Sequence, residues 1–265
     1  MKIAVCLSGQ PRVIDYAAPS ILNFFSGEHE FDYFCHSWDY NSYKRRKENP
    51  DIGEFPVWWE DDEKVDRNQL ISSLFLFNPK KHAIHGAEVL GKRFIWDSLM
   101  YSLMYANYLK KQYEIENNFR YDIVVRSRYD IIFPANNRFV VNKLASKDNY
   151  LDLFTIHAGR MTYEYNRVNA SDQLFYGSSL GMDMLCDTYR HIYTRLKDMR
   201  LDDLEYLGPG TYISDFAEDR NLRLTPVYRE LSSTVYRKEM IPSDPINNFE
   251  EHRIFNDSLY KIKYD

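Results

Sequence analysis

Residues 3–12 read IAVCLSGQPR, and this stretch decides how the chain begins to fold. Five apolar residues come first, and a serine, a glycine and a proline soon follow, so the pattern predicts a buried strand that ends in a turn. Residues 14–25 then show a helical pattern, and residues 31–36 (FDYFCH) form a second apolar run rich in aromatic side chains. A strand, a turn, a helix and a second strand in this order predict the start of a parallel α/β sheet.

The same kinds of pattern continue along the rest of the chain. Expected helices cover residues 66–76, 93–116, 179–198 and 208–218, and expected strands cover residues 82–85, 121–128, 139–141, 150–157, 174–176 and 222–227. The part after residue 241 contains two prolines and many polar residues, which indicates an irregular C-terminal part. We therefore expect an α/β fold with a mostly parallel central sheet flanked by helices, in a single domain that spans residues 1–265.

Composition narrows the classes of protein. A hydrophobic fraction of 44% allows a sizeable core, and a net charge of −5 argues against a nucleic-acid-binding protein. No apolar run reaches the roughly 18 residues that a membrane-spanning helix needs, so no span is expected. The three cysteines, Cys6, Cys35 and Cys186, lie far apart and form no CxxC spacing, which favours a reducing compartment such as the cytoplasm.

The charged segment at residues 126–130, RSRYD, directly follows the apolar core of an expected strand. Side chains alternate in a strand, so Arg126, Arg128 and Asp130 point the same way if the extended geometry persists. In open α/β sheets, ligands bind beyond the carboxyl ends of the strands, where these three charged groups need partners. A metal-bound diphosphate would satisfy all three groups, and so would an intramolecular network of arginines with the aspartate. Both interpretations remain open at this point.

Three segments together resemble a known family. Residues 3–12, the HSWD stretch at residues 36–39 and the YDIVVRSRYD stretch at residues 121–130 look like bacterial and bacteriophage sugar transferases of GT-A type. In that family an Arg-x-Arg-x-Asp segment stands in place of the usual Asp-x-Asp. The similarity extends through about residue 133, and beyond that point it rests on the SDQ stretch at residues 171–173.

The resemblance implies a GT-A-like catalytic domain, in which residues 1–135 bind the nucleotide and residues 136–265 bind the acceptor. It also implies an enzyme of hexosyltransferase type that depends on Mn²⁺ or Mg²⁺. Such an enzyme moves a sugar from a nucleoside-diphosphate sugar, by default a UDP-sugar, to a carbohydrate or other hydroxyl acceptor. The expected location is the cytoplasm, or the host cytoplasm if a phage encodes the protein.

The resemblance places the nucleotide site on the first two strand ends. Leu7, Ser8, Gly9 and Arg12 are expected to hold the nucleoside, where a glycine lets the backbone approach closely. Arg12 is expected to reach a phosphate or the base. Asp39, after the second strand, is expected to bond the base or the ribose.

The resemblance also assigns the metal and the chemistry. Asp130 is expected to bind Mn²⁺ or Mg²⁺ together with the diphosphate, and His252 is a candidate second metal ligand, the alternative being an unpaired surface histidine. One or both of Arg126 and Arg128 are expected to meet phosphate oxygens or to hold the Asp130 carboxylate in place, and Arg128 to stabilise the charge that develops on the departing diphosphate. Asp172 is the candidate catalytic base, the alternative being that it caps a helix.

Two other functions remain possible from the sequence. One is a transferase of another phosphate-bearing donor, such as a sulfotransferase, although residues 8–12 lack the glycines and the lysine of a P-loop. The other is a non-catalytic carbohydrate- or nucleotide-binding module. No convincing pair of opposed carboxylates indicates a glycoside hydrolase. The sequence leaves open the donor sugar, the acceptor, the stereochemical outcome and the oligomeric state.

Overall fold

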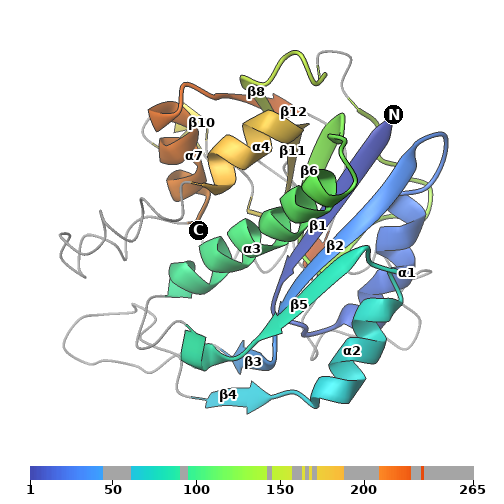
Figure 1. Cartoon of the computed structure of the whole chain (residues 1–265). Coiled ribbons are helices and arrows are strands. Elements are labelled where there is room, and N and C mark those ends of the chain that lie inside the picture. Colours follow the sequence, from blue (N-terminus) through green and yellow to red (C-terminus); the bar gives the residue numbers. More distant parts are fainter. Residues whose placement is uncertain are drawn as a thin grey trace, which may run out of the picture.

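The structure is a computed structural model, and it describes residues 1–43, 61–89, 95–141, 145–156, 163–164, 167–168, 172–187, 209–227 and 234–235. Figure 1 shows the arrangement of the helices and strands. In chain order the elements are β1 (Lys2–Gly9), α1 (Ile14–Phe24), β2 (Glu30–Trp38), β3 (Tyr40–Tyr43), β4 (Asp61–Lys64), α2 (Arg67–Phe75), β5 (Lys81–His85), the short 3₁₀ helix η1 (Ala87–Val89), α3 (Ile95–Glu116), β6 (Ile123–Ser127), β7 (Ile131–Ile132), β8 (Asp152–Ile156), β9 (Tyr163–Glu164), β10 (Arg167–Val168), β11 (Leu174–Ser178), α4 (Ser179–Cys186), α7 (Pro209–Asp219), β12 (Arg223–Val227) and β13 (Thr234–Val235).

Seven strands form the central sheet in the order β12-β8-β11-β6-β1-β2-β5. The pairs β1–β2, β1–β6, β2–β5 and β8–β12 are parallel, and β11 alone runs antiparallel to its two neighbours, β6 and β8. The expected α/β fold with a mostly parallel sheet flanked by helices is therefore confirmed. The sheet takes its strands from both sides of residue 135, the expected boundary between the two halves.

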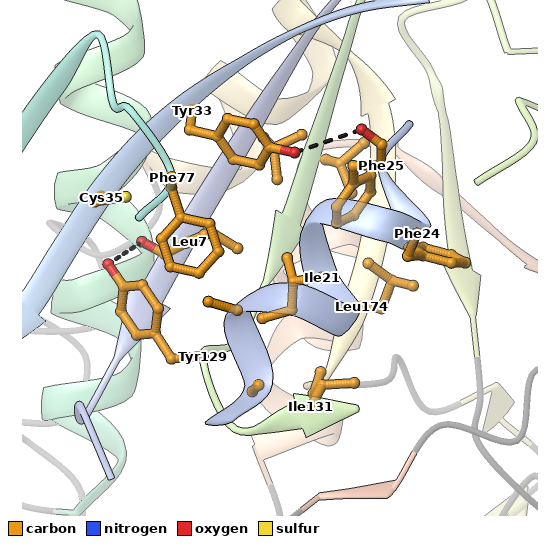
Figure 2. Close-up of a cluster of buried hydrophobic side chains, with 14 of the residues drawn as sticks. Leu7, Ile21, Phe24, Phe25, Tyr33, Cys35, Phe77, Tyr129, Ile131 and Leu174 are labelled. Carbon is orange, nitrogen blue, oxygen red and sulfur yellow. Dashed lines mark hydrogen bonds between the residues drawn. The ribbon is translucent and has the colours of Figure 1, made fainter. Parts of the chain in front are cut away.

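Both faces of the sheet are covered, which is why its central strands are apolar throughout. Residues 3–7 of β1 are almost completely buried and divide between the two faces: Ile3, Val5 and Leu7 pack with α1 and α2, whereas Ala4 and Cys6 pack with α3, α4 and α7. Figure 2 shows the first of these clusters, in which Leu7 lies beside Tyr129, whose hydroxyl contacts the Leu7 carbonyl oxygen.

The connections change face next to β1. The segments β1-α1-β2-α2-β5 build outward on one side of β1, and α3 then crosses the other face so that β6 lies on the opposite side of β1 (Figure 1). This arrangement makes the junction of β1 and β6 a topological switch point, and open α/β sheets bind ligands outside the carboxyl ends of the strands at such a point.

Several expected elements differ from the structure. Residues 139–141 are not a strand: Phe139 packs in the core and its backbone N–H donates to the carbonyl of Phe24, but Val140 is exposed and no partner strand pairs with it among the described residues. The strand expected at residues 121–128 ends at Ser127, and Asp130 lies in a turn. The irregular C-terminal part expected after residue 241 lies outside the described residues.

Two further findings concern the helices and the cysteines. None of the helices within the described part of the chain is long and apolar enough to span a membrane. Cys6, Cys35 and Cys186 are all buried and none of them forms a disulfide.

Candidate functional site

A cluster of charged side chains lies at the carboxyl edge of the sheet, at the β1–β6 switch point. Arg12 comes from the loop after β1, Arg128 and Asp130 from the segment after β6, and Asp172 from the residues just before β11. Since β11 is antiparallel to β6 and Leu174 pairs with Ser127, the start of β11 lies at the same edge as the end of β6. The charged side chains of segments that are far apart in the sequence, on strands that run in opposite directions, therefore lie close together at this edge.

Asp130 is the centre of this cluster and is only 4% exposed. Arg128 donates from Nε to Asp130 Oδ1 at 2.8 Å and from Nη2 to Oδ2 at 2.7 Å. Arg12 donates from Nη1 to the same Oδ2 at 2.7 Å. Two planar guanidiniums thus hold both oxygens of one buried carboxylate, the geometry in which arginine pairs most strongly.

The pairing fixes the charges of the cluster. Burial alone would raise the pKa of Asp130, but the charges and hydrogen bonds of Arg128 and Arg12 outweigh burial and lower this pKa to about 2. Burial likewise opposes the charge of Arg128, yet Asp130 and Asp172 raise the pKa of Arg128 above its ordinary value. Asp130 and Arg128 are therefore both ionised at neutral pH.

Asp172 joins the cluster through the third nitrogen of Arg128, whose Nη1 donates to Asp172 Oδ2 at 2.9 Å. The alternative that Asp172 caps a helix is wrong, because a strand follows Asp172 and Ser178 caps the helix α4 by accepting from the backbone N–H of Gly181. Asp172 is a quarter exposed, so a ligand at this edge can reach its carboxylate.

Arg126 lies in β6 itself, between Cys6 of β1 and Phe175 of β11. The residue is 1% exposed, and none of its guanidinium nitrogens has a hydrogen-bond partner among the residues that the structure describes. Its guanidinium carbon lies 5.8 Å from the centre of the Phe175 ring. Burial lowers the pKa of Arg126 to about 10, and the charge of Asp172 offsets this only in part.

The expected alignment of Arg126, Arg128 and Asp130 thus holds only in part. Strand geometry stops at Ser127, and the turn at Asp130 brings this carboxylate back onto Arg128. The partner that the sequence did not suggest for Asp130 is Arg12, which was expected at a phosphate or the base. The intramolecular network is therefore present in the structure, with Arg126 left out of it.

The loop after β1 has a backbone that a ligand could approach closely, because Gly9 carries no side chain. Gly9 has φ +133°, in the region that favours glycine, and a side chain there would meet no atom within 4 Å. The hydroxyl of Ser8 is buried without a hydrogen-bond partner in the described part of the structure. Arg12 also has positive φ, 23°, and its backbone N–H donates to Asn41 Oδ1 at 2.8 Å, which ties the loop after β1 to strand β3. The side chain of Leu7, by contrast, belongs to the core.

Asp39 lies directly after β2, at the same edge of the sheet, and it is largely buried. Its backbone N–H donates to the carbonyl of His85, and its carbonyl accepts from the backbone N–H of Val65. The structure therefore fixes the backbone of Asp39, and its expected contact with a base or ribose stays a prediction.

Tyr129 fixes the turn that carries Arg128 and Asp130 by binding to the core strands, a role that the sequence did not indicate. Its side chain points away from Arg128 into the core, where the hydroxyl lies 3.1 Å from the carbonyl oxygen of Leu7 and 3.2 Å from that of His36 (Figure 2 shows the first contact). These contacts join the turn after β6 to β1 and β2. The alternation within RSRYD already placed Tyr129 opposite its charged neighbours, and that was the available signal.

A second polar group lies further along the same edge, at the ends of β2 and β5. His36 Nδ1 lies 2.6 Å from Ser102 Oγ, and His36 Nε2 lies 3.1 Å from His85 Nδ1. Burial, and then the neighbouring His85, lower the pKa of His36 well below its ordinary value. Trp38 packs edge-on against His36, so the sequence HSWD contributes core contacts as well as the loop residue Asp39.

The expected metal ligands are only partly placed. Asp130 offers the carboxylate oxygens that Mg²⁺ and Mn²⁺ prefer, but both oxygens accept from arginines in this structure. Within the described ranges, no group of three or more His, Cys, Asp or Glu side chains is placed to hold a metal ion. His252 lies outside the described residues.

Comparison with known proteins adds no family to this geometry. No protein-family model matches the chain, and no curated protein matches its sequence. A functional assignment therefore depends on the side-chain arrangement and on its position in the fold.

Proposed function

We propose that the protein is a glycosyltransferase with a GT-A-like fold that moves a sugar from a nucleoside-diphosphate sugar, with UDP as the nucleotide, to a hydroxyl group of a carbohydrate or other acceptor. The observation that carries the proposal is the meeting of Arg12, Arg128, Asp130 and Asp172 at the β1–β6 switch point. A nucleotide bound at this edge of the sheet would lay its phosphates beside two guanidiniums.

The charges suit the leaving group of such a transfer. Breaking the bond between sugar and phosphate leaves negative charge on the nucleoside diphosphate, and preorganised guanidiniums stabilise this charge in the transition state. Arg128 and Arg12 are held in position before substrate arrives, because Asp130 fixes one end of each fork. Gly9, with open space beside it, allows the backbone to approach a nucleotide closely.

Asp172 is the group that we assign to the acceptor. It is bonded to Arg128 through one oxygen, which orients the carboxylate, and its partial exposure lets an acceptor hydroxyl reach it. A carboxylate in this position would accept the proton of the attacking hydroxyl in an inverting reaction. The assignment requires kcat to fall in Asp172→Asn while the affinity for UDP stays near that of the wild-type protein.

A divalent cation, Mn²⁺ or Mg²⁺, is part of the proposal, and it would stabilise the departing diphosphate as a Lewis acid. The chemistry of the donor group fits, since phosphate oxygens compete with Asp130 for the arginines and would release a carboxylate oxygen. We place the reaction in the cytoplasm, because three free cysteines suit a reducing compartment.

The deciding experiment measures hydrolysis of a panel of UDP- and GDP-sugars, with Mn²⁺, with Mg²⁺ and with EDTA, alongside calorimetry of UDP and GDP. We expect slow hydrolysis of one donor with metal, and loss of metal-dependent UDP binding in Asp130→Ala. Asp148→Asn is the matched control, because Asp148 is exposed and precedes β8 at the opposite edge of the sheet.

Two results would overturn the proposal. UDP binding without hydrolysis of any donor would identify a non-catalytic binding module. Binding of adenosine 3′,5′-bisphosphate in preference to UDP would identify a sulfotransferase. Retention of metal-dependent UDP binding in a folded Asp130→Ala protein would remove Asp130 as the metal ligand and leave the transfer reaction itself untouched.

A further inference from the structure

Arg126 is a buried cation for which the described structure provides no hydrogen-bonding acceptor. All of its guanidinium nitrogens are buried without a hydrogen-bond partner among the described residues. The two nearby carboxylates are already engaged, Asp130 by Arg128 and Arg12, and Asp172 by Arg128. A buried charge without a hydrogen-bonding partner is costly, so this group calls for an explanation, and a bound ion that completes it is one.

The net charge of the whole cluster also indicates that a negatively charged partner would stabilise Arg126. Arg12, Arg126 and Arg128 carry three positive charges against the two negative charges of Asp130 and Asp172, so the five side chains leave one positive charge uncompensated. The ring of Phe175 faces the guanidinium of Arg126, which stabilises its charge weakly and directs its planar fork. An oxyanion would supply both the hydrogen-bond acceptor and the negative charge that the described residues do not provide for Arg126.

The position of Arg126 indicates which part of a substrate would supply that oxyanion. Arg126 lies two residues before Arg128, or roughly 6.6 Å further back along the strand, on the face that α3 and α4 cover. Its guanidinium lies against Phe175 of β11, the strand that directly follows Asp172 and Gln173. Asp172 is also the carboxylate that acts on it most strongly.

We propose that Arg126 is the receptor for an oxyanion at the sugar end of the donor, and that it binds this oxyanion through its guanidinium without a metal ion. This inference rests on the proposed function for the identity of the donor. The oxyanion has two possible sources with the same chemistry: the sugar-linked phosphate of the diphosphate, or a carboxylate on the sugar itself.

The test combines stability and affinity, each measured with Mn²⁺ and again in EDTA. Melting temperatures and dissociation constants are measured for pyrophosphate, UDP, UDP-glucose and UDP-glucuronate with the wild-type protein and Arg126→Met. Without ligand, we expect Arg126→Met to melt at the wild-type temperature or a few degrees higher, because methionine fills similar volume without a buried charge. Its affinity for the ligand that carries the oxyanion should fall roughly 10- to 100-fold.

The ligands separate the two sources. A loss of affinity for UDP and pyrophosphate identifies the phosphate, whereas a loss confined to UDP-glucuronate identifies a sugar carboxylate. Arg120→Met is the matched control for removal of one positive charge, because Arg120 is exposed and lies before β6 at the opposite edge of the sheet. It should keep every affinity of the wild-type protein.

Unchanged affinity of Arg126→Met for all four ligands overturns the inference. If Arg126→Met does not fold, Arg126→Lys replaces it, since a lysine keeps the charge but loses the fork. An unchanged affinity of Arg126→Lys then overturns the inference. Anion binding without hydrolysis of any nucleotide-sugar would remove the proposed function and leave the oxyanion receptor standing.

Discussion

Arg128 donates to both oxygens of Asp130, at 2.8 and 2.7 Å, although only one residue separates the two in sequence. This contact is possible because β6 ends at Ser127 and the chain turns before Asp130. Tyr129, between them, points the opposite way and fastens the turn to the strands β1 and β2. The turn after Ser127 therefore brings Arg128 and Asp130 together, and the buried Tyr129 hydroxyl fixes this turn to the sheet.

The pairing of Asp130 makes stability depend on pH in the acid range. Because the folded pKa is lowered from 3.8 to about 2, the unfolded chain binds its proton first as the pH falls. The pair therefore contributes about 2 kcal/mol to the free energy of unfolding above pH 4, and this contribution is lost between about pH 4 and pH 2. Urea unfolding in EDTA across this range checks it, and Asp130→Asn should lack this part of the pH dependence. An identical pH profile in the variant would contradict the assignment.

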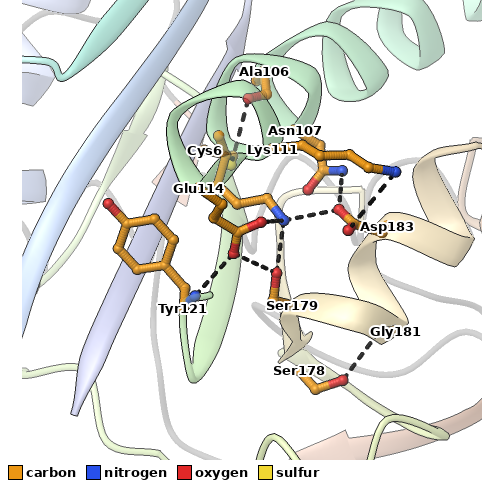
Figure 3. Close-up of polar contacts among 11 residues, drawn as sticks. Cys6, Ala106, Asn107, Lys111, Glu114, Tyr121, Ser178, Ser179, Gly181 and Asp183 are labelled. Atoms are coloured by element: carbon orange, nitrogen blue, oxygen red, sulfur yellow. Dashed lines mark hydrogen bonds and ion pairs between the residues drawn. The ribbon is translucent and has the colours of Figure 1, made fainter. Parts of the chain in front are cut away.

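The ion-pair network between α3 and α4 makes a separate prediction about stability. Lys110 is fully buried and donates to Glu114 at 3.0 Å, to Asp183 at 2.8 Å and to Ser179 at 2.7 Å. Figure 3 shows these carboxylates between the two helices, with Glu114 also accepting from the backbone N–H of Tyr121. Lys110→Met would leave two buried carboxylates without their cation, and we expect a loss of about 3–5 kcal/mol.

The neighbouring Lys111 provides the control for that experiment. It is partly exposed and lies 4.0 Å from Asp183, so Lys111→Met should cost less than about 1 kcal/mol. Urea denaturation of both variants gives the comparison. Equal losses in the two variants would show that burial of Lys110 does not determine the effect.

The histidine pair at the ends of β2 and β5 predicts a second pH dependence, in which folding again favours the deprotonated form, here the neutral imidazole. Burial keeps His36 neutral in the folded protein, and His85 beside it has its pKa lowered by burial and by Arg67, with Glu88 opposing the change. As the pH falls below 6.5, His36 becomes protonated in the unfolded chain but stays neutral in the folded protein. Stability should therefore fall with decreasing pH, by up to about 1.4 kcal/mol per pH unit for this one group.

His36→Gln tests this prediction, because glutamine does not titrate. Thermal unfolding between pH 7.5 and pH 5 should show a smaller pH dependence in this variant than in the wild-type protein. His82→Gln is the control, since His82 is exposed on β5, and it should keep the wild-type dependence. A steeper fall in His36→Gln would mean that other groups govern this range.

Much of the fold could be predicted because apolar periodicity reports burial directly. The run IAVCL predicts β1, and the helical patterns predict α1, α2 and α3 to within a few residues. The strand expected at residues 139–141 was wrong, because three consecutive apolar residues satisfy the pattern of a short buried strand without any partner to pair with. Phe139 is apolar because it packs against Phe24, not because it belongs to a sheet.

The sequence could predict which residues belong to the candidate site, but not which of their side chains contact one another. The sequence singled out Arg12, Arg128, Asp130 and Asp172 as charged groups at strand ends. It did not indicate that Arg12 bonds to Asp130, since that contact spans 118 residues and depends on β1 and β6 being neighbours. Nor could it separate Arg126 from Arg128, which the same alternation places on one face.

The sequence by itself determined which segments are buried, where strands end in polar turns, and which charged residues follow those ends, because local patterns of apolar and polar residues carry that information. Only the tertiary structure decided the order of the strands, and with it the switch point where Arg12 meets Asp130. It also decided that Arg128 has two partners and Arg126 no hydrogen-bond acceptor among the described residues. The physical reason is that an ion pair depends on distance in space, and that distance is set by how the whole sheet assembles.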